Sequence, residues 1–309
     1  MSLWIIGIAA ARLSSRVLQN LLIYIPAFCF TAQLVYFFFA DEKSSFFWAH
    51  RLVLATDHPG VLAVLCVIPI FATLWKFQRA FAWLDVLVGI ALPLAVLFFT
   101  YARASMLGVF VVFCFAALLN HRFRKIALAS FAVVTVCGIL FMPAQQKERF
   151  GQTLRAPLHQ KTFLSRLPIW EATLNGIEQH PLLGNTHKSF RGHFERYVQE
   201  HKAELKSKYT FVEATQYHAH NIYLGLVYNW GIVGFALIAG LAGYALWTSG
   251  KMGLGYVWNC LLFLAVYGCF EFPFHRKDGA FLFFFALGLA YGRYAVWPRF
   301  TGASAAGSA

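Results

Sequence analysis

The chain has 309 residues, of which 59% are hydrophobic and only 13% are charged, and its formal net charge is +13. A soluble domain averages about 25% charged residues, so this composition excludes an ordinary soluble globular protein. The apolar residues occur in runs long enough to cross a bilayer, which indicates that they face lipid. The positive charge is then first a determinant of membrane topology, and we expect no nucleic acid partner.

The apolar runs predict an all-α, polytopic membrane protein with about eight or nine transmembrane helices. In chain order the predicted spans are residues 3–11, 18–40, 60–74, 81–100, 104–120, 126–142, 221–248, 254–270 and 279–294. The first span is weak because it is short. It is interpreted as a short or incomplete first helix.

Lysine and arginine are concentrated on alternate connections between the spans, and these connections are predicted to be cytoplasmic. Strict alternation then places the long polar segment outside, in the periplasm of a bacterial cell. We predict N-terminal transmembrane helices over residues 1–142, a large periplasmic loop over 143–219, C-terminal transmembrane helices over 220–296 and a disordered cytoplasmic tail over 297–309. The loop is poor in apolar residues, so we expect a cap on the membrane helices rather than an independent domain.

Two helices are predicted inside this loop. Residues 165–179 have helical spacing, with Leu167, Trp170, Leu174 and Ile177 on one side. His180-Pro181 ends this helix, and Gly184-Asn185 forms a turn. Residues 191–209 form a second, highly charged helix.

The most specific string is Tyr217-His218-Ala219-His220-Asn221, where the loop meets a membrane helix. A histidine at a membrane mouth titrates near neutrality and suits a general base. The alternative is an interfacial histidine beside an aromatic-belt tyrosine. Further along the helix, Gly231 and Gly234 allow it to bend or to pack closely.

Two arginines are predicted on the same external face. Arg103 stands between two apolar spans, and Arg166 stands at the start of the first loop helix. The planar guanidinium matches phosphate oxygens with two parallel hydrogen bonds, so both residues suit a lipid-linked phosphate. The alternatives are contact of Arg103 with lipid headgroups and a solvated helix start for Arg166.

Three strings together carry a family resemblance. His220-Asn221, then nine residues, then Gly231-x-x-Gly234 resembles the signature of the O-antigen ligases. Residues 101–108 resemble the arginine-containing helix start of that family. Residues 165–184 resemble its arginine–tryptophan helix and the Pro-Leu-Leu-Gly turn that follows. The chain therefore resembles the O-antigen ligase/polymerase superfamily, and its ligase branch in particular.

The resemblance implies a membrane-embedded glycosyltransferase fold of the GT-C class that needs no metal and no cofactor. It implies a donor glycan on undecaprenyl diphosphate, and an acceptor hydroxyl on the lipid A–core. By position, His220 corresponds to the proposed base, and Arg103 and Arg166 correspond to the arginines thought to bind the diphosphate. We expect these three side chains to meet in one pocket at the outer leaflet, with membrane lipids as further partners.

Five more residues are substrate-binding candidates: Trp170, Arg191, His218, Asn221 and Tyr223. A solvated helix face is the alternative for Arg191. His218 and His220 also invite a metal site, but no Asp or Cys completes a ligand set at a convincing spacing, so we expect no metal.

Three other functions remain open. An O-antigen polymerase uses the same donor with a growing lipid-linked glycan as acceptor, and a protein O-oligosaccharyltransferase uses a Ser or Thr of a protein. Phe235 follows Gly234 where the ligase signature usually has Thr, so the branch within the superfamily is open. A transporter or flippase belongs to a different class, and it usually places ionisable residues near the bilayer midplane rather than at one mouth.

Overall fold

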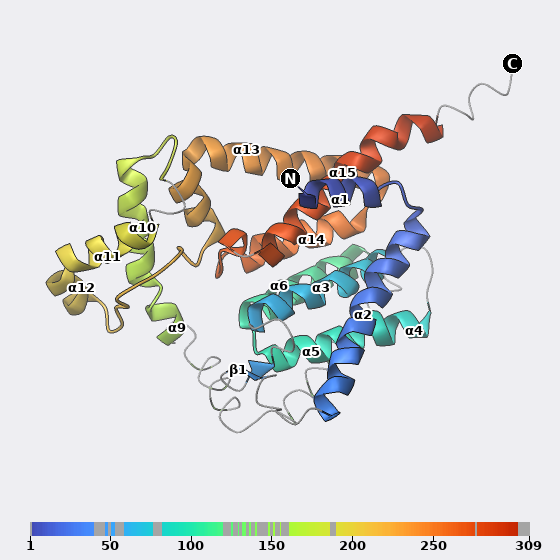
Figure 1. Ribbon diagram of the computed structural model, residues 1–309, viewed down its shortest axis with the longest axis horizontal. Helices are drawn as coiled ribbons and strands as arrows, with labels where there is room; N and C mark the ends of the chain where they lie inside the picture. Colours follow the sequence, from blue (N-terminus) through green and yellow to red (C-terminus); the bar gives the residue numbers. More distant parts are fainter. Residues whose placement is uncertain are drawn as a thin grey trace, which may run out of the picture. The chain divides into compact units, whose positions relative to one another are not determined.

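The computed structural model describes residues 2–39, 47–48, 51–52, 59–76, 82–119, 161–185, 190–275 and 277–301, with isolated positions between 125 and 155. Most of these residues are helical (Figure 1). The exception to the all-α prediction is a short antiparallel hairpin, in which β1 (Phe47–Trp48) pairs with β2 (Arg51–Leu52). The chain forms two compact units, one over residues 1–138, 241–267 and 277–309, and the other over 139–240 and 268–276.

Unit 1 consists of apolar helices. They are α1 (Ser2–Ala10), α2 (Ser15–Phe39), α3 (Pro59–Lys76), α4 (Trp83–Val86), the π-helical segment η3 (Leu87–Ala91), α5 (Leu92–Thr100), α6 (Arg103–Leu119), α14 (Gly255–Tyr267) and α15 (Lys277–Thr301). A helix lies at each predicted span of this unit except 126–142, which falls almost entirely outside the described residues. Hydrophobic runs are therefore a sound guide to these helices.

Small residues let the helices of unit 1 pack closely, as membrane helices generally do. A Cβ on Gly108 of α6 would lie 2.7 Å from the ring of Phe263 in α14, and a Cβ on Gly7 of α1 would lie 2.6 Å from the carbonyl oxygen of Phe285 in α15. The centre of the unit contains fully buried Phe71, Trp75, Tyr256 and Phe263. The rings of Phe71 and Phe263 meet edge to face at 5.6 Å.

One buried carboxylate ties three helices of unit 1 together. Asp85, at the start of α4, is 1% exposed. Its Oδ1 atom accepts hydrogen bonds from Lys76 of α3 at 2.8 Å and from the Tyr24 hydroxyl of α2 at 2.7 Å. Lys76 also donates to Asn20 at 2.9 Å. A buried charge needs such partners, and these contacts give Oδ1 of Asp85 a structural role in joining the helices.

Two described helices are long and apolar enough to cross a membrane by length and composition. They are the continuous helix Trp83–Thr100, formed by α4, η3 and α5, and α13 (Ile222–Met252). Four shorter apolar helices accompany them: Gly60–Lys76, Arg103–Leu119, Gly255–Tyr267 and Gly279–Ala295. The helices are thus consistent with the membrane protein that the composition predicts.

Unit 2 contains the polar helices and the first part of α13. Its helices are α9 (Lys161–Leu164), α10 (Leu167–Gln179), α11 (Phe190–Glu200), α12 (Lys202–Lys208) and the 3-10 turn η6 (Pro273–His275). α10 follows the prediction closely. The predicted single helix over 191–209 is wrong, because the chain breaks at His201 into α11 and α12.

Unit 2 has an apolar core of its own, which the sequence did not predict. The core contains Ile169 and Ala172 of α10, Phe190, Phe194 and Tyr197 of α11, Leu205 of α12, and Ala219 and Tyr228. Tyr228 comes from α13, so the first turns of this apolar helix supply part of the core. This borrowed surface explains why a segment poor in apolar residues forms a compact unit.

α13 bends at Gly231, as its glycines predict. Gly231 has φ 65° and ψ −175°, a conformation that is essentially restricted to glycine. The turn after α10 fits into this bend, because the N–H groups of Ile232 and Val233 donate to the carbonyl oxygens of Pro181 (2.9 Å) and Leu182 (3.3 Å). The turn thereby satisfies backbone donors that a kinked helix leaves without helical partners.

The substitution Gly231→Ala is expected to destabilise the protein by about 3 kcal/mol or more. An added Cβ would lie 2.0 Å from the carbonyl oxygen of Leu182, and the backbone conformation is strained for alanine. Gly240 lies in the same helix with open space around its Cβ position. Gly240→Ala is therefore the matched control and should be neutral or slightly stabilising. Thermal melting of both variants in detergent tests this, and equal melting temperatures would contradict it.

A second carboxylate joins the helices of unit 2. Glu171 of α10 accepts hydrogen bonds from the Tyr197 hydroxyl at 3.1 Å, from Lys208 at 2.7 Å and from the Tyr209 hydroxyl. Burial alone raises the pKa of Glu171, but the hydrogen bonds from Lys208, Tyr209 and Tyr197 outweigh burial and lower the pKa below its ordinary 4.5. Burial, and then the hydrogen bond to Glu171, raise the pKa of Tyr197 to about 12.

The stabilisation by Glu171 is expected to depend on pH. Because the folded-state pKa is lowered, the stabilisation is complete above about pH 4.5 and is lost as the pH falls through the folded-state pKa. At pH 7, Glu171→Gln should lower the melting temperature by about 2–4 °C. Melting curves of both proteins across pH 3–8 check this. A difference that stays constant down to pH 3 would contradict it.

Candidate active site

The candidate site is built on the short segment that leads into α13. Asn221 caps the helix, since its Oδ1 accepts from the Leu224 N–H at 3.0 Å. Its Nδ2 donates to the carbonyl oxygen of Cys269 at 3.1 Å, so the cap also fixes the 268–276 connection. On the other side, the Trp170 indole of α10 donates to the carbonyl oxygen of Ala219 at 3.0 Å. The segment is therefore held from two directions.

His220 adopts an uncommon backbone conformation in this segment. Its φ is 48°, in the left-handed region that non-glycine residues seldom occupy. The His220 N–H points to His218 Nδ1 at 3.3 Å, and the two imidazole rings lie 4.0 Å apart. Such strain persists only where surrounding contacts fix the residue, and it occurs preferentially at functional sites.

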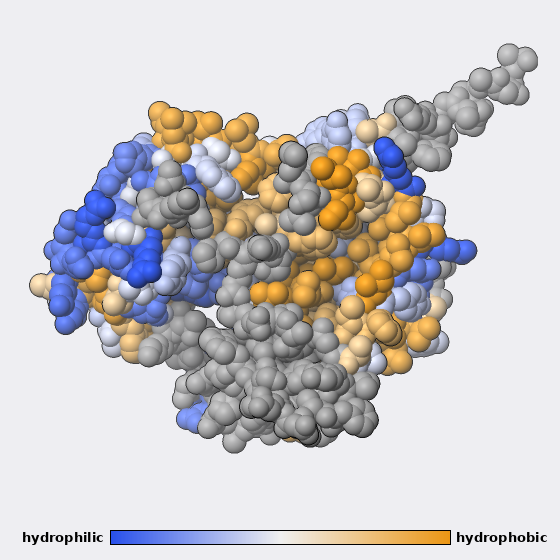
Figure 2. All heavy atoms as spheres, in the orientation of Figure 1, coloured by the Kyte–Doolittle hydropathy of each residue, from blue (hydrophilic) through white to orange (hydrophobic). Residues whose placement is uncertain are grey.

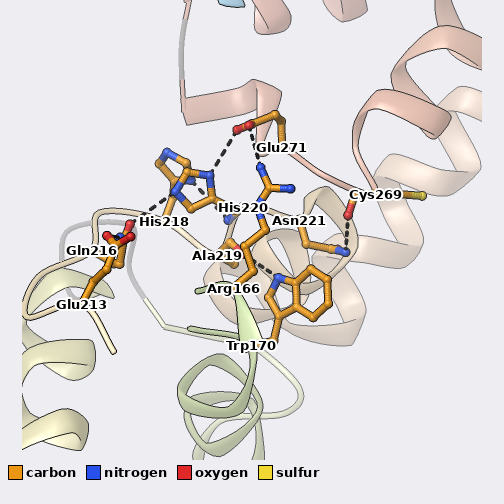
Figure 3. Close-up of polar contacts among 10 residues, drawn as sticks. All are labelled: Arg166, Trp170, Glu213, Gln216, His218, Ala219, His220, Asn221, Cys269 and Glu271. Carbon is orange, nitrogen blue, oxygen red and sulfur yellow. Dashed lines mark hydrogen bonds and ion pairs between the residues drawn. The ribbon is translucent and has the colours of Figure 1, made fainter. Parts of the chain in front are cut away.

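Glu271 joins His220 to Arg166 through its two carboxylate oxygens (Figure 3). Arg166 Nη2 lies 2.9 Å from Oε1, and His220 Nδ1 lies 3.2 Å from Oε2. The Arg166 side chain is 13% exposed and that of His220 is 25% exposed. These partly buried groups feel a lower dielectric than bulk water, so their charges interact more strongly than on an open surface.

The second nitrogen of His220 faces Gln216. His220 Nε2 lies 3.3 Å from Gln216 Oε1, while the amide nitrogen of Gln216 donates to Glu213. Both imidazole nitrogens thus face oxygens that can accept a hydrogen bond, and the neutral ring has a proton on one of the two nitrogens. If an incoming hydroxyl displaced Gln216, the contact with Glu271 would keep a proton on Nδ1 and leave Nε2 able to accept one.

Residues 86–239 match the family model described as O-antigen ligase. The chain belongs to the O-antigen ligase/polymerase superfamily. Members of this superfamily are membrane glycosyltransferase-type enzymes of the bacterial inner membrane, and they act on lipid-linked glycans. Among curated proteins, no significant match was found.

The superfamily match includes Arg103, Arg166 and His220. The structure brings Arg166 and His220 together on Glu271. Arg103 belongs to unit 1, where it is the first residue of α6 and follows a sharp turn at Tyr101, whose φ is 50°. The participation of Arg103 in a common pocket stays a prediction. Among the described residues no group of three or more His, Cys, Asp or Glu side chains is arranged to hold a metal ion.

The further substrate-binding candidates differ in what their side chains contact. Trp170 and Asn221 hold the backbone of the segment, as described above, which is a structural role. Arg191 of α11 is exposed, pairs with Glu195 at 2.7 Å and lies 5.2 Å above the Tyr217 ring. Tyr223 is 40% exposed on the first turn of α13. A substrate contact by any of them remains a prediction.

Glu271 and Gln216, which contact the candidate base His220, were not singled out as candidates from the sequence. Glu271 lies 51 residues beyond His220 and outside the segment that the family model matches. Its one sequence signal was its place in a short connection that also contains Arg276 and Lys277, on the predicted external side. The sequence thus indicated only that a carboxylate lies on the same predicted face as His220, the candidate base.

Proposed function

We propose that this protein is an O-antigen ligase-type glycosyltransferase. It transfers a glycan from undecaprenyl diphosphate to a hydroxyl of the lipid A–core, on the periplasmic side of the bacterial inner membrane. The observation that supports this most directly is the Glu271 carboxylate, which holds His220 and Arg166 side by side in a chain of this superfamily. A base and a phosphate-binding cation are the two groups that the reaction requires.

His220 acts as the general base. The acceptor hydroxyl displaces Gln216 and donates its proton to Nε2, while the hydroxyl oxygen attacks the anomeric carbon of the donor glycan. The new C–O bond forms as the bond between the anomeric carbon and the diphosphate oxygen breaks, and undecaprenyl diphosphate leaves with the bonding electrons. Displacement from the opposite face inverts the anomeric centre. The step needs no metal and no cofactor.

Glu271 positions the base and stabilises the imidazolium that forms. A carboxylate bound to Nδ1–H fixes the tautomer whose Nε2 accepts a proton, which is the logic of catalytic triads generally. Without this contact the imidazole could rotate or carry its proton on the wrong nitrogen. Glu271 is therefore a positioning residue for His220.

Arg166 stabilises the charge that develops on the leaving diphosphate, and Arg103 shares this role. Among the described residues the Arg166 guanidinium is engaged through Nη2 with Glu271, so its other N–H groups can bind phosphate oxygens. Preorganised cations at a leaving group can contribute as much to the rate as a positioned base. His218, Arg191 and Tyr223 are proposed to contact the substrates.

A transfer assay with three acceptors tests the proposal. Purified protein in liposomes receives an undecaprenyl diphosphate-linked glycan together with lipid A–core, a lipid-linked glycan or a periplasmic protein. Product on lipid A–core supports a ligase. Product on the lipid-linked glycan or on protein would replace the ligase with a polymerase or an O-oligosaccharyltransferase. Movement of the intact donor across the bilayer without a product would overturn the glycosyltransferase and favour a flippase.

A further inference from the structure

The turn between α10 and α11 exposes two large apolar side chains at its tip. Leu182 is 64% exposed and Leu183 is 78% exposed, the highest fraction of any large apolar side chain described. Beside them on α13, Trp230, Ile232 and Val233 are also exposed. Figure 2 shows hydrophobic residues gathered over this edge of the unit, whereas the surface over α11 and α12 is hydrophilic.

This turn is held rigidly although its tip is exposed. The Gly184 N–H donates to the carbonyl oxygen of His180 at 3.0 Å, and the Asn185 N–H donates to that of Tyr228 at 2.6 Å. The Asn185 side chain donates to the carbonyl oxygen of Gly176 at 3.0 Å. A Cβ on Gly184 would lie 2.3 Å from the Gly231 nitrogen, so the two backbones are in direct contact. The leucines are therefore fixed at the level of the bend in α13.

The length of α13 indicates where that bend lies in the bilayer. Its 31 residues would extend about 46 Å, much longer than the hydrocarbon core of about 30 Å. The part after Gly231 would extend about 31 Å, which matches the core. Trp247 lies near the other end of this part, where Lys251 rests 3.7 Å above its ring, as expected at the opposite interface. Gly231 and the turn then lie at the outer boundary of the hydrocarbon core.

We propose that the Pro181–Gly184 turn is a membrane anchor whose Leu182 and Leu183 side chains insert among the acyl chains of the outer leaflet. The occupant of this apolar surface is bilayer lipid, because the surface is continuous with the exposed apolar face of α13, which includes Ile232, Val233 and Leu237. The anchor fixes unit 2 against the membrane. It places the segment with His220, which precedes the bend, in the headgroup region where a polyprenyl carrier presents its diphosphate.

Spin labels in liposomes test the anchor independently of any transferase activity. Single cysteines replace Leu183 or, as the matched control, Gln179 at the exposed end of α10, in full-length protein whose native cysteines are removed. The label at 183 should collide with dissolved oxygen at least about threefold more often than with a water-soluble nickel complex, and the label at 179 should show the reverse. A label at 183 that meets the nickel complex as often as the label at 179 overturns the proposal.

A second label distinguishes local misfolding from a true negative result. Leu182→Cys places the probe one residue earlier on the same turn and keeps the Leu182 carbonyl that the Val233 N–H contacts. If both labels report an aqueous environment while circular dichroism and melting temperature match the parent protein, the leucines face water and the anchor is excluded. The glycosyltransferase proposal would survive that outcome, because it depends on His220, Arg166 and Glu271.

Discussion

Replacing His220 with asparagine is expected to reduce glycan transfer by about 10²–10⁴-fold, the range in which a positioned general base typically contributes. Asparagine removes the base but tolerates the left-handed backbone that His220 adopts at φ 48°. Alanine at this position would confound loss of the base with backbone strain. The rate of glycan transfer by purified protein in liposomes, at saturating donor and acceptor, measures the effect.

His180 supplies the matched control for this substitution. It is an exposed histidine at the end of α10, so His180→Asn changes the same functional group elsewhere on unit 2. Transfer should stay within about twofold of the parent rate, because surface substitutions away from a site have small effects. Full transfer by the His220→Asn variant would eliminate His220 as the base.

Much of the helical framework could be predicted from the sequence because its signals are local. Apolar runs indicate the helices of unit 1. A glycine indicates the bend of α13, since the φ and ψ of Gly231 are essentially restricted to glycine. His180-Pro181 and Gly184 likewise indicate the turn after α10. The break at His201 has no such signal, because no glycine or proline marks it. The break brings Leu205 into the core beside Tyr197. Tertiary packing therefore requires the break, and packing leaves no local signal in the sequence.

The candidate site was less predictable for the same physical reason. Arg166 and His220 could be singled out because the strings that contain them resemble a family. Glu271 belongs to a short polar connection between apolar spans, where charged residues are ordinary, so its charge did not single it out. Its contact with His220 depends on the docking of residues 268–276 against the start of α13, where the Ile222 N–H donates to the Gly268 carbonyl oxygen at 2.7 Å. Such long-range pairing leaves no periodic trace in one sequence.

Replacing Glu271 with glutamine is expected to reduce the transfer rate by about 10²-fold or more. The amide has nearly the same shape as the carboxylate, but it lacks the charge that holds Arg166 and His220 together. Each hydrogen bond to a charged group contributes about 1.5–3 kcal/mol, and a loss of about 1.4 kcal/mol is tenfold in rate. Glu178→Gln, on the exposed face of α10, is the control for loss of a surface carboxylate.

The manner of the loss distinguishes positioning from general destabilisation. If Glu271 acts by orienting His220, the rate at saturating substrate should fall while the melting temperature stays near that of the parent protein. Glu271→Asp should recover little activity, because a side chain shorter by one methylene cannot reach Arg166 and His220 at once. A variant that loses activity only in proportion to its loss of folded protein would argue for a structural role.

A double variant provides the sharpest discrimination. Residues that act as one unit have non-additive effects, so Glu271→Gln should cost little once His220 has been replaced by asparagine. The double variant is therefore expected to transfer glycan at nearly the rate of His220→Asn alone, apart from the share of the loss that comes through Arg166. If the two losses multiply fully, Glu271 serves Arg166 and the diphosphate rather than the base, and the proposed link between the carboxylate and the imidazole fails.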